Sequence, residues 1–317
     1  GAPPHRLTLS FPMRPLRRLS VLVCTLALAS LTLPLSAQRT NKPLLHGKHW
    51  VAVTGKPLAA TAGARMFHRG GNAIDAACAM LAATCTMWDT LGWGGETQAL
   101  IYNPKTGQVI GVNALGIAPT GATPEFFRGQ GMIFPPEYGP LSAVTPGTPG
   151  GLMVMLAEFG TLSLADVLAP AIEMADGYPI EAQAADQIER MRGEIERWHE
   201  SKKVFLPHHD AAHPKARAAP RAGDIFVQSE LAVTLRKLVA VERAALDAGR
   251  VRKAANMAAY ARFYPGDLAQ ELVRGTQAEG GLITLADLDR WSVKLEAPVA
   301  VNYKGVEVYK LTTWTQG

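Results

Sequence analysis

The stretch that decides the fold is GGNAIDAACAM, residues 70–80. Its two glycines accept the positive φ that ends a helix, and the Ala-rich residues 58–69 before them have a helical pattern. Asn72 is a good N-cap for a second helix over residues 73–87, and Asp75 lies in the first turn, where the helix dipole favours negative charge. The stretch therefore predicts two helices that pack closely through small residues.

Hydrophobic periodicity and turn residues predict the remaining elements. Further helices are expected at 152–159, 163–175, 183–203, 229–248, 250–262, 268–276 and 284–288. Strands are expected at 50–54, 98–102, 108–112, 299–303 and 306–311. Loops are expected at 117–150, which is rich in Pro and Gly, and at 207–224. This pattern favours one unit of α and β elements, mostly helical.

The composition suits a globular protein and gives no sign of nucleic-acid binding. The chain has 317 residues, of which 48% are hydrophobic, enough for a sizeable core. Its isoelectric point of about 9.1 comes from the first 37 residues, which hold four arginines and no acid. The rest of the chain has 28 basic and 27 acidic residues, a nearly even balance that predicts no nucleic-acid partner.

The basic N-terminal segment has the features of an export signal. Within residues 13–37, arginines precede the apolar run Leu19–Leu33, and small residues suited to signal-peptide cleavage follow it. A weaker alternative cleavage site lies at Ala27–Ala29. The run is short for a membrane span. We therefore expect residues 1–12 to be upstream sequence, and residues 38–317 to be periplasmic or secreted, without a membrane anchor.

Cys78 and Cys85 are the cysteines that follow this signal. They lie seven residues apart on one predicted helix, which separates them by roughly 10 Å along its axis. That distance is too long for a disulfide, so we interpret both as buried packing thiols.

A histidine cluster has the composition, but not the spacing, of a metal site. His208, His209, Asp210 and His213 lie in the predicted charged loop between two prolines. Adjacent histidines do not easily converge on one ion without a scaffold, so we predict a solvated loop and no metal.

The stretch at 70–80 resembles the GGNAxDAA signature of the gamma-glutamyltranspeptidase family. Residues 139–152, 164–180, 263–269 and 280–291 resemble four more strings of that family. All five stand in family order. The resemblance implies an α+β fold, the four-layer αββα architecture of N-terminal-nucleophile hydrolases, present here in part as most of the large subunit. Residues 240–262 form a longer connection than is usual in the family and have no role by resemblance.

The resemblance also implies a mechanism without a cofactor. An internal threonine cleaves its own preceding peptide bond and becomes an N-terminal nucleophile, with its α-amine as the base. That threonine is expected after Gly317, so the chain alone is expected to be inactive and to need its own C-terminal small subunit as partner. Thr312, Thr313 and Thr315 follow the last predicted strand and are interpreted as a polar loop.

Three residues are candidates for substrate binding. The family has an arginine for the substrate carboxylate just before its APxxAT segment, which here reads Ala118–Thr123. The matching position is Leu115, two residues after Asn113, and leucine cannot pair with a carboxylate. Either another cation substitutes or the acyl group differs. Glu96 replaces a family glycine, either facing the pocket or, as we favour, as a solvated turn carboxylate.

The resemblance favours an exported, self-processing amidase. Its small-molecule substrate would be a gamma-glutamyl compound such as glutathione, cleaved by hydrolysis or transpeptidation. One alternative, favoured by Leu115, is a related acylase or amidohydrolase with a non-glutamyl acyl donor. Another is a non-catalytic binding or scaffold protein.

Overall fold

The computed structural model describes residues 45–88 and 91–316. The chain divides into two compact units, Gly1–Gly47 and Lys48–Gly317, and every helix and strand of the described residues lies in the second. The segments predicted as upstream sequence and signal peptide, residues 1–37, lie outside the described residues.

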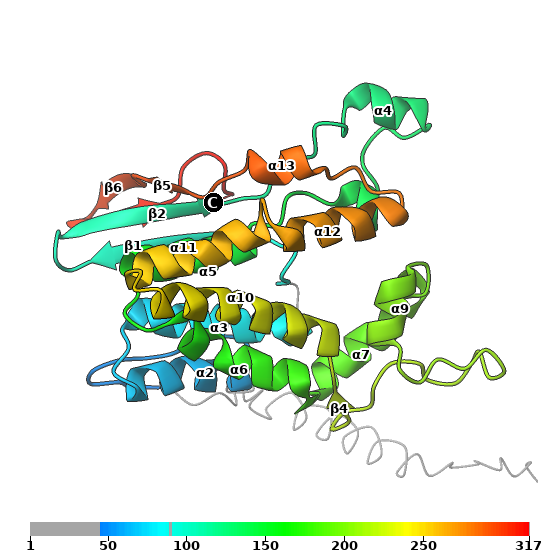
Figure 1. Cartoon of the computed structure of the whole chain (residues 1–317), viewed down its shortest axis with the longest axis horizontal. Helices are drawn as coiled ribbons and strands as arrows, with labels where there is room; N and C mark the ends of the chain where they lie inside the picture. Colours follow the sequence, from blue (N-terminus) through cyan, green and yellow to red (C-terminus); the bar gives the residue numbers. More distant parts are fainter. Residues whose placement is uncertain (1–44, 89–90, 317) are drawn as a thin grey trace, which may run out of the picture. The chain divides into compact units, whose positions relative to one another are not determined.

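Helices dominate the second unit, and Figure 1 shows several of them stacked on one side of a small sheet. The helices are α2 (Pro57–His68), α3 (Ala73–Thr86), α4 (Pro124–Gly129), η1 (Pro140–Ser142), α5 (Thr148–Phe159), α6 (Leu164–Asp176), α7 (Ala182–Arg190), α8 (Arg192–Ile195), α9 (His199–Phe205), α10 (Ser229–Asp247), α11 (Arg252–Phe263), α12 (Asp267–Ala278) and α13 (Leu285–Asp289). The strands are β1 (Thr97–Asn103), β2 (Gln108–Ala114), β3 (Tyr178–Pro179), β4 (Ile225–Phe226), β5 (Lys294–Glu296), β6 (Val299–Tyr303) and β7 (Val306–Lys310).

The glycine-rich stretch separates α2 from α3 as its sequence predicts. Gly70 has a φ of 81°, and the Asn72 side chain accepts from the backbone N–H groups of Ile74 and Asp75. The Asp75 carboxylate accepts from the N–H of Asn72 in return, which completes a capping box. The Asn72 amide also donates to the carbonyl of Phe159, the last residue of α5, at 2.7 Å. The signature therefore starts one helix and at the same time binds it to another.

Strands β1, β2 and β5 form an antiparallel sheet in that spatial order. Thr97, Val112 and Ala114 on one face are buried beneath α5. The opposite face is open along β1, where Leu100 and Tyr102 are 42% and 64% exposed. The strands predicted at residues 98–102 and 108–112 are confirmed; they pair as an antiparallel hairpin and are slightly longer than expected.

The longer connection at residues 240–262 has a structural role. It contains the end of α10, a turn at Gly249 with φ 80°, and most of α11. Glu242 is buried and accepts from the N–H groups of Leu164 and Ala165 at the start of α6, while the Arg252 guanidinium donates to two carbonyls at the end of α5. The connection thus caps two other helices.

The prediction of one helix over residues 183–203 is wrong, because the chain forms α7, α8 and α9 instead. The break follows from packing: Ile195 is buried, and the Trp198 ring lies against Gly139, where a Cβ would come within 2.2 Å of it. Trp198 has extended backbone angles, so the helix cannot continue through it. Gly193 lowers the helix propensity nearby.

The prediction of a strand at residues 50–54 is also wrong. This segment pairs with no strand of the described residues, and Val51 and Val53 remain 49% and 67% exposed. The Trp50 ring instead stacks on Phe67 of α2, with ring centroids 4.8 Å apart. The alternating pattern therefore reflects a contact between Trp50 and helix α2, and not a strand in a sheet.

The other predicted helices and strands are present, with shifted ends. Helix α5 begins at Thr148, earlier than predicted, and the expected loop at residues 117–150 contains the short α4 and η1. Cys78 and Cys85 are buried and unbridged, as expected, and burial raises the pKa of the Cys78 thiol. Within residues 45–88 and 91–316, no helix has the length and apolar character needed to cross a membrane.

Candidate functional site

Three loops meet where β1 begins and β2 ends. The carbonyl of Gly95, in the glycine-rich turn before β1, accepts from the N–H groups of Gly147 and Thr148 at 2.7 and 2.9 Å. The N–H of Thr145 donates to the carbonyl of Ile117 at 3.0 Å. The Pro-Gly turn before α5 therefore fastens the segments that carry Glu96 and Leu115.

The turn approaches β2 closely because Gly147 has no side chain. A Cβ on Gly147 would lie 1.9 Å from the carbonyl oxygen of Ala114, which is backbone and cannot move freely. We expect Gly147→Ala to lower the free energy of unfolding by about 2 kcal/mol. Gly193→Ala is the control, because nothing lies within 4 Å of its Cβ position and alanine favours the helix. Urea denaturation would measure both; equal stability of the two variants contradicts the expectation.

A row of polar residues, here called the polar row, crosses the open face of the sheet at this end. Gln98 of β1 lies opposite Asn113 of β2, which lies opposite Lys294 of β5. Directly paired residues point to the same face of a sheet. The Gln98 amide also donates to Glu96 Oε1 at 2.8 Å, which places a carboxylate at the β1 end of the row. The polar row therefore consists of Glu96, Gln98, Asn113 and Lys294.

The three candidate residues from the sequence lie close to one another. Asn113 Oδ1 accepts from the N–H of Leu115 at 3.2 Å, and the carbonyl of Leu115 accepts from the Trp291 indole at 2.9 Å. Leu115 is half-buried and Glu96 is exposed. Sequence reasoning missed Gln98 and Lys294, since Lys294 reaches Asn113 only through the pairing of β5 with β2.

The C-terminal segment of the described residues folds back over the same face. Leu311 covers Gly111 of β2, where a Cβ would lie 3.0 Å from its side chain, and Figure 1 shows this red segment beside β2. Glu296 accepts from the Thr312 hydroxyl at 3.1 Å and from the Trp314 indole. Lys310 Nζ binds the Thr315 hydroxyl at 2.9 Å and three carbonyls of residues 311–315. These bonds hold the segment as an anchored polar loop.

Asp287 fixes the loop that follows Leu115. Its carboxylate is fully buried and accepts from the N–H and hydroxyl of Thr120 and from those of Thr284. Burial raises the pKa of Asp287, but the hydrogen bonds from Thr120 and Thr284 outweigh it and lower the pKa from 3.8 to about 2. Arg290 adds an ion pair at 2.9 Å. A charged carboxylate therefore ties α13 to the loop beside the site.

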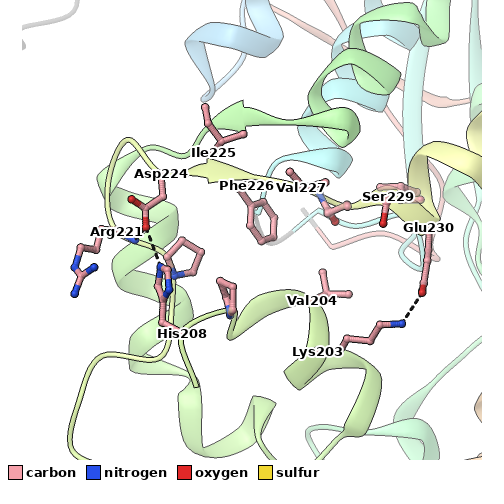
Figure 2. A pocket seen from close by; sticks show the side chains of 14 residues that line it. Lys203, Val204, His208, Arg221, Asp224, Ile225, Phe226, Val227, Ser229 and Glu230 are labelled. Carbon is pink, nitrogen blue, oxygen red and sulfur yellow. Dashed lines mark hydrogen bonds and ion pairs between the residues drawn. The ribbon is translucent and has the colours of Figure 1, made fainter. Parts of the chain in front are cut away.

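The histidine cluster does not converge. His208, His209 and His213 contact three different carboxylates, those of Asp224, Glu196 and Asp210. In the part of the chain that the structure describes, no group of three ligating side chains could hold a metal ion. Figure 2 shows His208 and Asp224 paired at the edge of a pocket of about 660 Å³, with Lys203 and Glu230 paired elsewhere on its wall. Lys203 and Glu230 neutralise each other there, and the pocket contains no residue of the polar row.

Comparison with known proteins identifies the family. A family model described as Gamma-glutamyltranspeptidase matches residues 59–317. The chain is 32% identical over 280 residues to the glutathione hydrolase-like YwrD proenzyme of Bacillus subtilis (strain 168), covering 87% of this chain and 48% of that protein. It is 31% identical over 276 residues to the acylase ACY 1 proenzyme of Pseudomonas sp. (strain SE83), covering 83% and 44%. The chain thus spans about half the length of the curated relatives it matches.

Comparison with solved structures supports the same family. The gamma-glutamyltranspeptidase of Helicobacter pylori superposes with a TM-score of 0.73 at 29% identity, covering 86% of this chain and 72% of that one. A cephalosporin acylase from Bacillus halodurans gives 0.68 at 29% identity, covering 87% and 49%. The helix-rich unit with its small sheets is therefore part of the fold shared by these enzymes.

Proposed function

Because this chain belongs to the gamma-glutamyltranspeptidase family, we propose that it is the large-subunit part of an exported, self-processing amidase that cleaves gamma-glutamyl amides such as glutathione. The family match over residues 59–317 carries the proposal. Relatives named as glutathione hydrolase or glutathione hydrolase-like proenzymes support it. The arginine-led apolar segment within residues 13–37 supports export.

The nucleophile belongs to chain after Gly317. There a threonine hydroxyl attacks the amide carbonyl, its α-amine accepts the proton, and an acyl-threonine forms as the amine leaves. Water then hydrolyses this ester, or an amine acceptor takes the acyl group. The residues described here bind and orient the acyl group: the polar row offers its amides and charges, and Asp287 holds the neighbouring loop.

The C-terminal small subunit is the proposed occupant of the open sheet face. Besides Leu100 and Tyr102, the β6–β7 hairpin exposes a row of apolar side chains on one face, with Val301 and Tyr303 each 62% exposed. An isolated two-stranded hairpin is marginally stable in water, so this surface needs a cover. The half of the relatives' length that this chain does not span supplies that cover.

A related acylase with a non-glutamyl acyl donor is the second candidate. Leu115 favours it, since a leucine stands where the family resemblance places a carboxylate-binding arginine. The 31% identity to an acylase proenzyme also supports this second candidate.

The test is expression of the full-length protein. We expect two bands on a denaturing gel, from self-cleavage, and faster release of nitroaniline from a gamma-glutamyl nitroanilide than from a glutaryl nitroanilide. Alanine at the downstream threonine should leave one uncleaved, inactive band. Cleaved enzyme that prefers the glutaryl compound would support the acylase function. One uncleaved band from the unaltered protein would overturn the enzymatic proposal and favour a binding or scaffold protein.

A further inference from the structure

The hydroxyl of Tyr264 bonds both ends of the Pro-Gly turn before α5. Tyr264 is buried just after α11, and its hydroxyl donates to the carbonyl of Pro146 at 2.6 Å. The same hydroxyl accepts from the N–H of Gly150 at 2.9 Å. Gly150 lies in the first turn of α5, where N–H groups have no acceptor within the helix, and the N-cap Gly147 has no side chain to supply one. Burial raises the pKa of Tyr264, so the hydroxyl keeps the proton that it donates.

Trp291 holds the neighbouring segment and contacts the same turn. Its indole donates to the carbonyl of Leu115 at 2.9 Å, and its ring centroid lies 4.9 Å from that of Tyr264. A Cβ on Gly150 would lie 2.7 Å from both the Tyr264 hydroxyl and the Trp291 ring, so no space separates the turn from the two rings. Tyr264, Trp291 and Gly150 are all buried, so these contacts do not depend on what covers the surface of the chain.

The turn transmits its position to Glu96. The carbonyl of Gly95 accepts from the N–H groups of Gly147 and Thr148, both in or next to the segment that Tyr264 holds. A Cβ on Gly147 would lie 3.4 Å from the Cα of Glu96, so the two backbones are in close contact. A shift of the turn would therefore move Gly95, and Glu96 would move with it.

We propose that Tyr264 is a positioning residue for the acyl donor: its hydroxyl fixes the Pro-Gly turn, and the turn sets the place of Glu96 beside the Leu115 segment. The inference rests on the proposed function and adds a residue that acts without touching the substrate. Because the nucleophile belongs to chain after Gly317, Tyr264 acts on binding of the acyl donor and not on the chemical step.

The experiment uses the full-length, self-processed protein and the variant Tyr264→Phe, which keeps the ring and removes the hydroxyl. The variant leaves the carbonyl of Pro146 and the N–H of Gly150 unpaired in buried surroundings, so the turn should shift. KM is measured for the nitroanilide that the unaltered protein cleaves faster. We expect KM to rise about tenfold and kcat to stay within about twofold, because the lost positioning acts on ground state and transition state alike.

Hydrogen exchange measured by mass spectrometry follows the turn directly. The peptide of residues 144–151 contains the N–H groups of Gly147 and Thr148 that hold Gly95. In Tyr264→Phe, we expect exchange in this peptide to become about tenfold faster.

Two control variants separate positioning from a general loss of stability. Tyr178→Phe removes the hydroxyl of another buried tyrosine, in β3, and Ile188→Val removes one buried methylene from α7. Both residues belong to a different buried cluster from that of Tyr264 and Trp291. Ile188→Val should lower the urea midpoint, as Tyr264→Phe does. Both controls should keep the KM of the unaltered protein and its exchange at residues 144–151.

A KM for Tyr264→Phe equal to that of the unaltered protein would overturn the inference, as would an equal rise of KM in Ile188→Val. Unchanged exchange at residues 144–151 would also overturn it. Failure of the proposed function looks different, because the unaltered protein would then stay uncleaved or release no nitroaniline. In that case faster exchange in Tyr264→Phe would still support anchoring of the turn by Tyr264, and unchanged exchange would exclude it.

Discussion

Replacing Asp75 by alanine should lower the free energy of unfolding by about 4 kcal/mol. The Asp75 carboxylate is fully buried and accepts from the N–H of Asn72 at 2.8 Å, which closes the capping box of α3. It also accepts from the N–H groups of Thr161 and Leu162 and from the Thr161 hydroxyl. Alanine would leave three backbone donors without their acceptor and would detach α3 from the α5–α6 connection.

Urea denaturation of the full-length protein would measure this loss. Asp75→Asn should cost less, about 2 kcal/mol, because the amide keeps the shape and one accepting oxygen. The control is Asp247→Ala, since Asp247 is exposed at the end of α10 and should change stability by less than about 0.5 kcal/mol. A loss at Asp75 no larger than at Asp247 would show that the signature carboxylate is not structural.

Replacing Asp287 by alanine should lower the free energy of unfolding by about 3 kcal/mol. The variant loses the acceptor for Thr120 and Thr284 and leaves Arg290 without its partner. Asp289→Ala, two residues later and exposed, is the matched control and should be nearly neutral. Comparable urea midpoints for the two variants would contradict the expected role.

The lowered pKa of Asp287 also predicts a pH dependence. The pKa is about 2 in the folded state against an ordinary 3.8, so the folded protein holds this proton less tightly than the unfolded chain. The stabilisation is therefore fully present above pH 3.8 and is lost as the pH falls toward 2. Between pH 5 and 2, the unaltered protein should lose about 2 kcal/mol more than Asp287→Asn. Parallel stability curves would exclude this linkage.

Much of the fold could be predicted from local patterns. The cap at Asn72 could be predicted from a short string, because the groups that form it are neighbours in the sequence. Predictions failed where distant packing overrides the local pattern. The charged pattern at 183–203 is helical throughout, yet Trp198 leaves the helix to lie against Gly139. The alternation at 50–54 reads as a strand, yet Trp50 stacks on a helix.

Some residues of the candidate site could likewise be predicted from the sequence, and others could not. The sequence drew attention to Glu96, Asn113 and Leu115 through one segment of resemblance and its departures from the family pattern. Gln98 and Lys294 carry no local signal: a polar residue on an exposed strand and a lysine near the end of the chain are ordinary features. Only strand pairing places Lys294 opposite Asn113.

By itself, then, the sequence determined the family, the class of fold and the helices that carry the signature strings, because caps, glycine turns and apolar periodicity act between near neighbours. The tertiary structure decided which side chains share a surface. Antiparallel pairing of β5 with β2 assembles the polar row from segments far apart in the chain, and buried carboxylates such as Asp75 and Asp287 acquire partners that no local pattern names. Contacts of that kind depend on the whole packed chain.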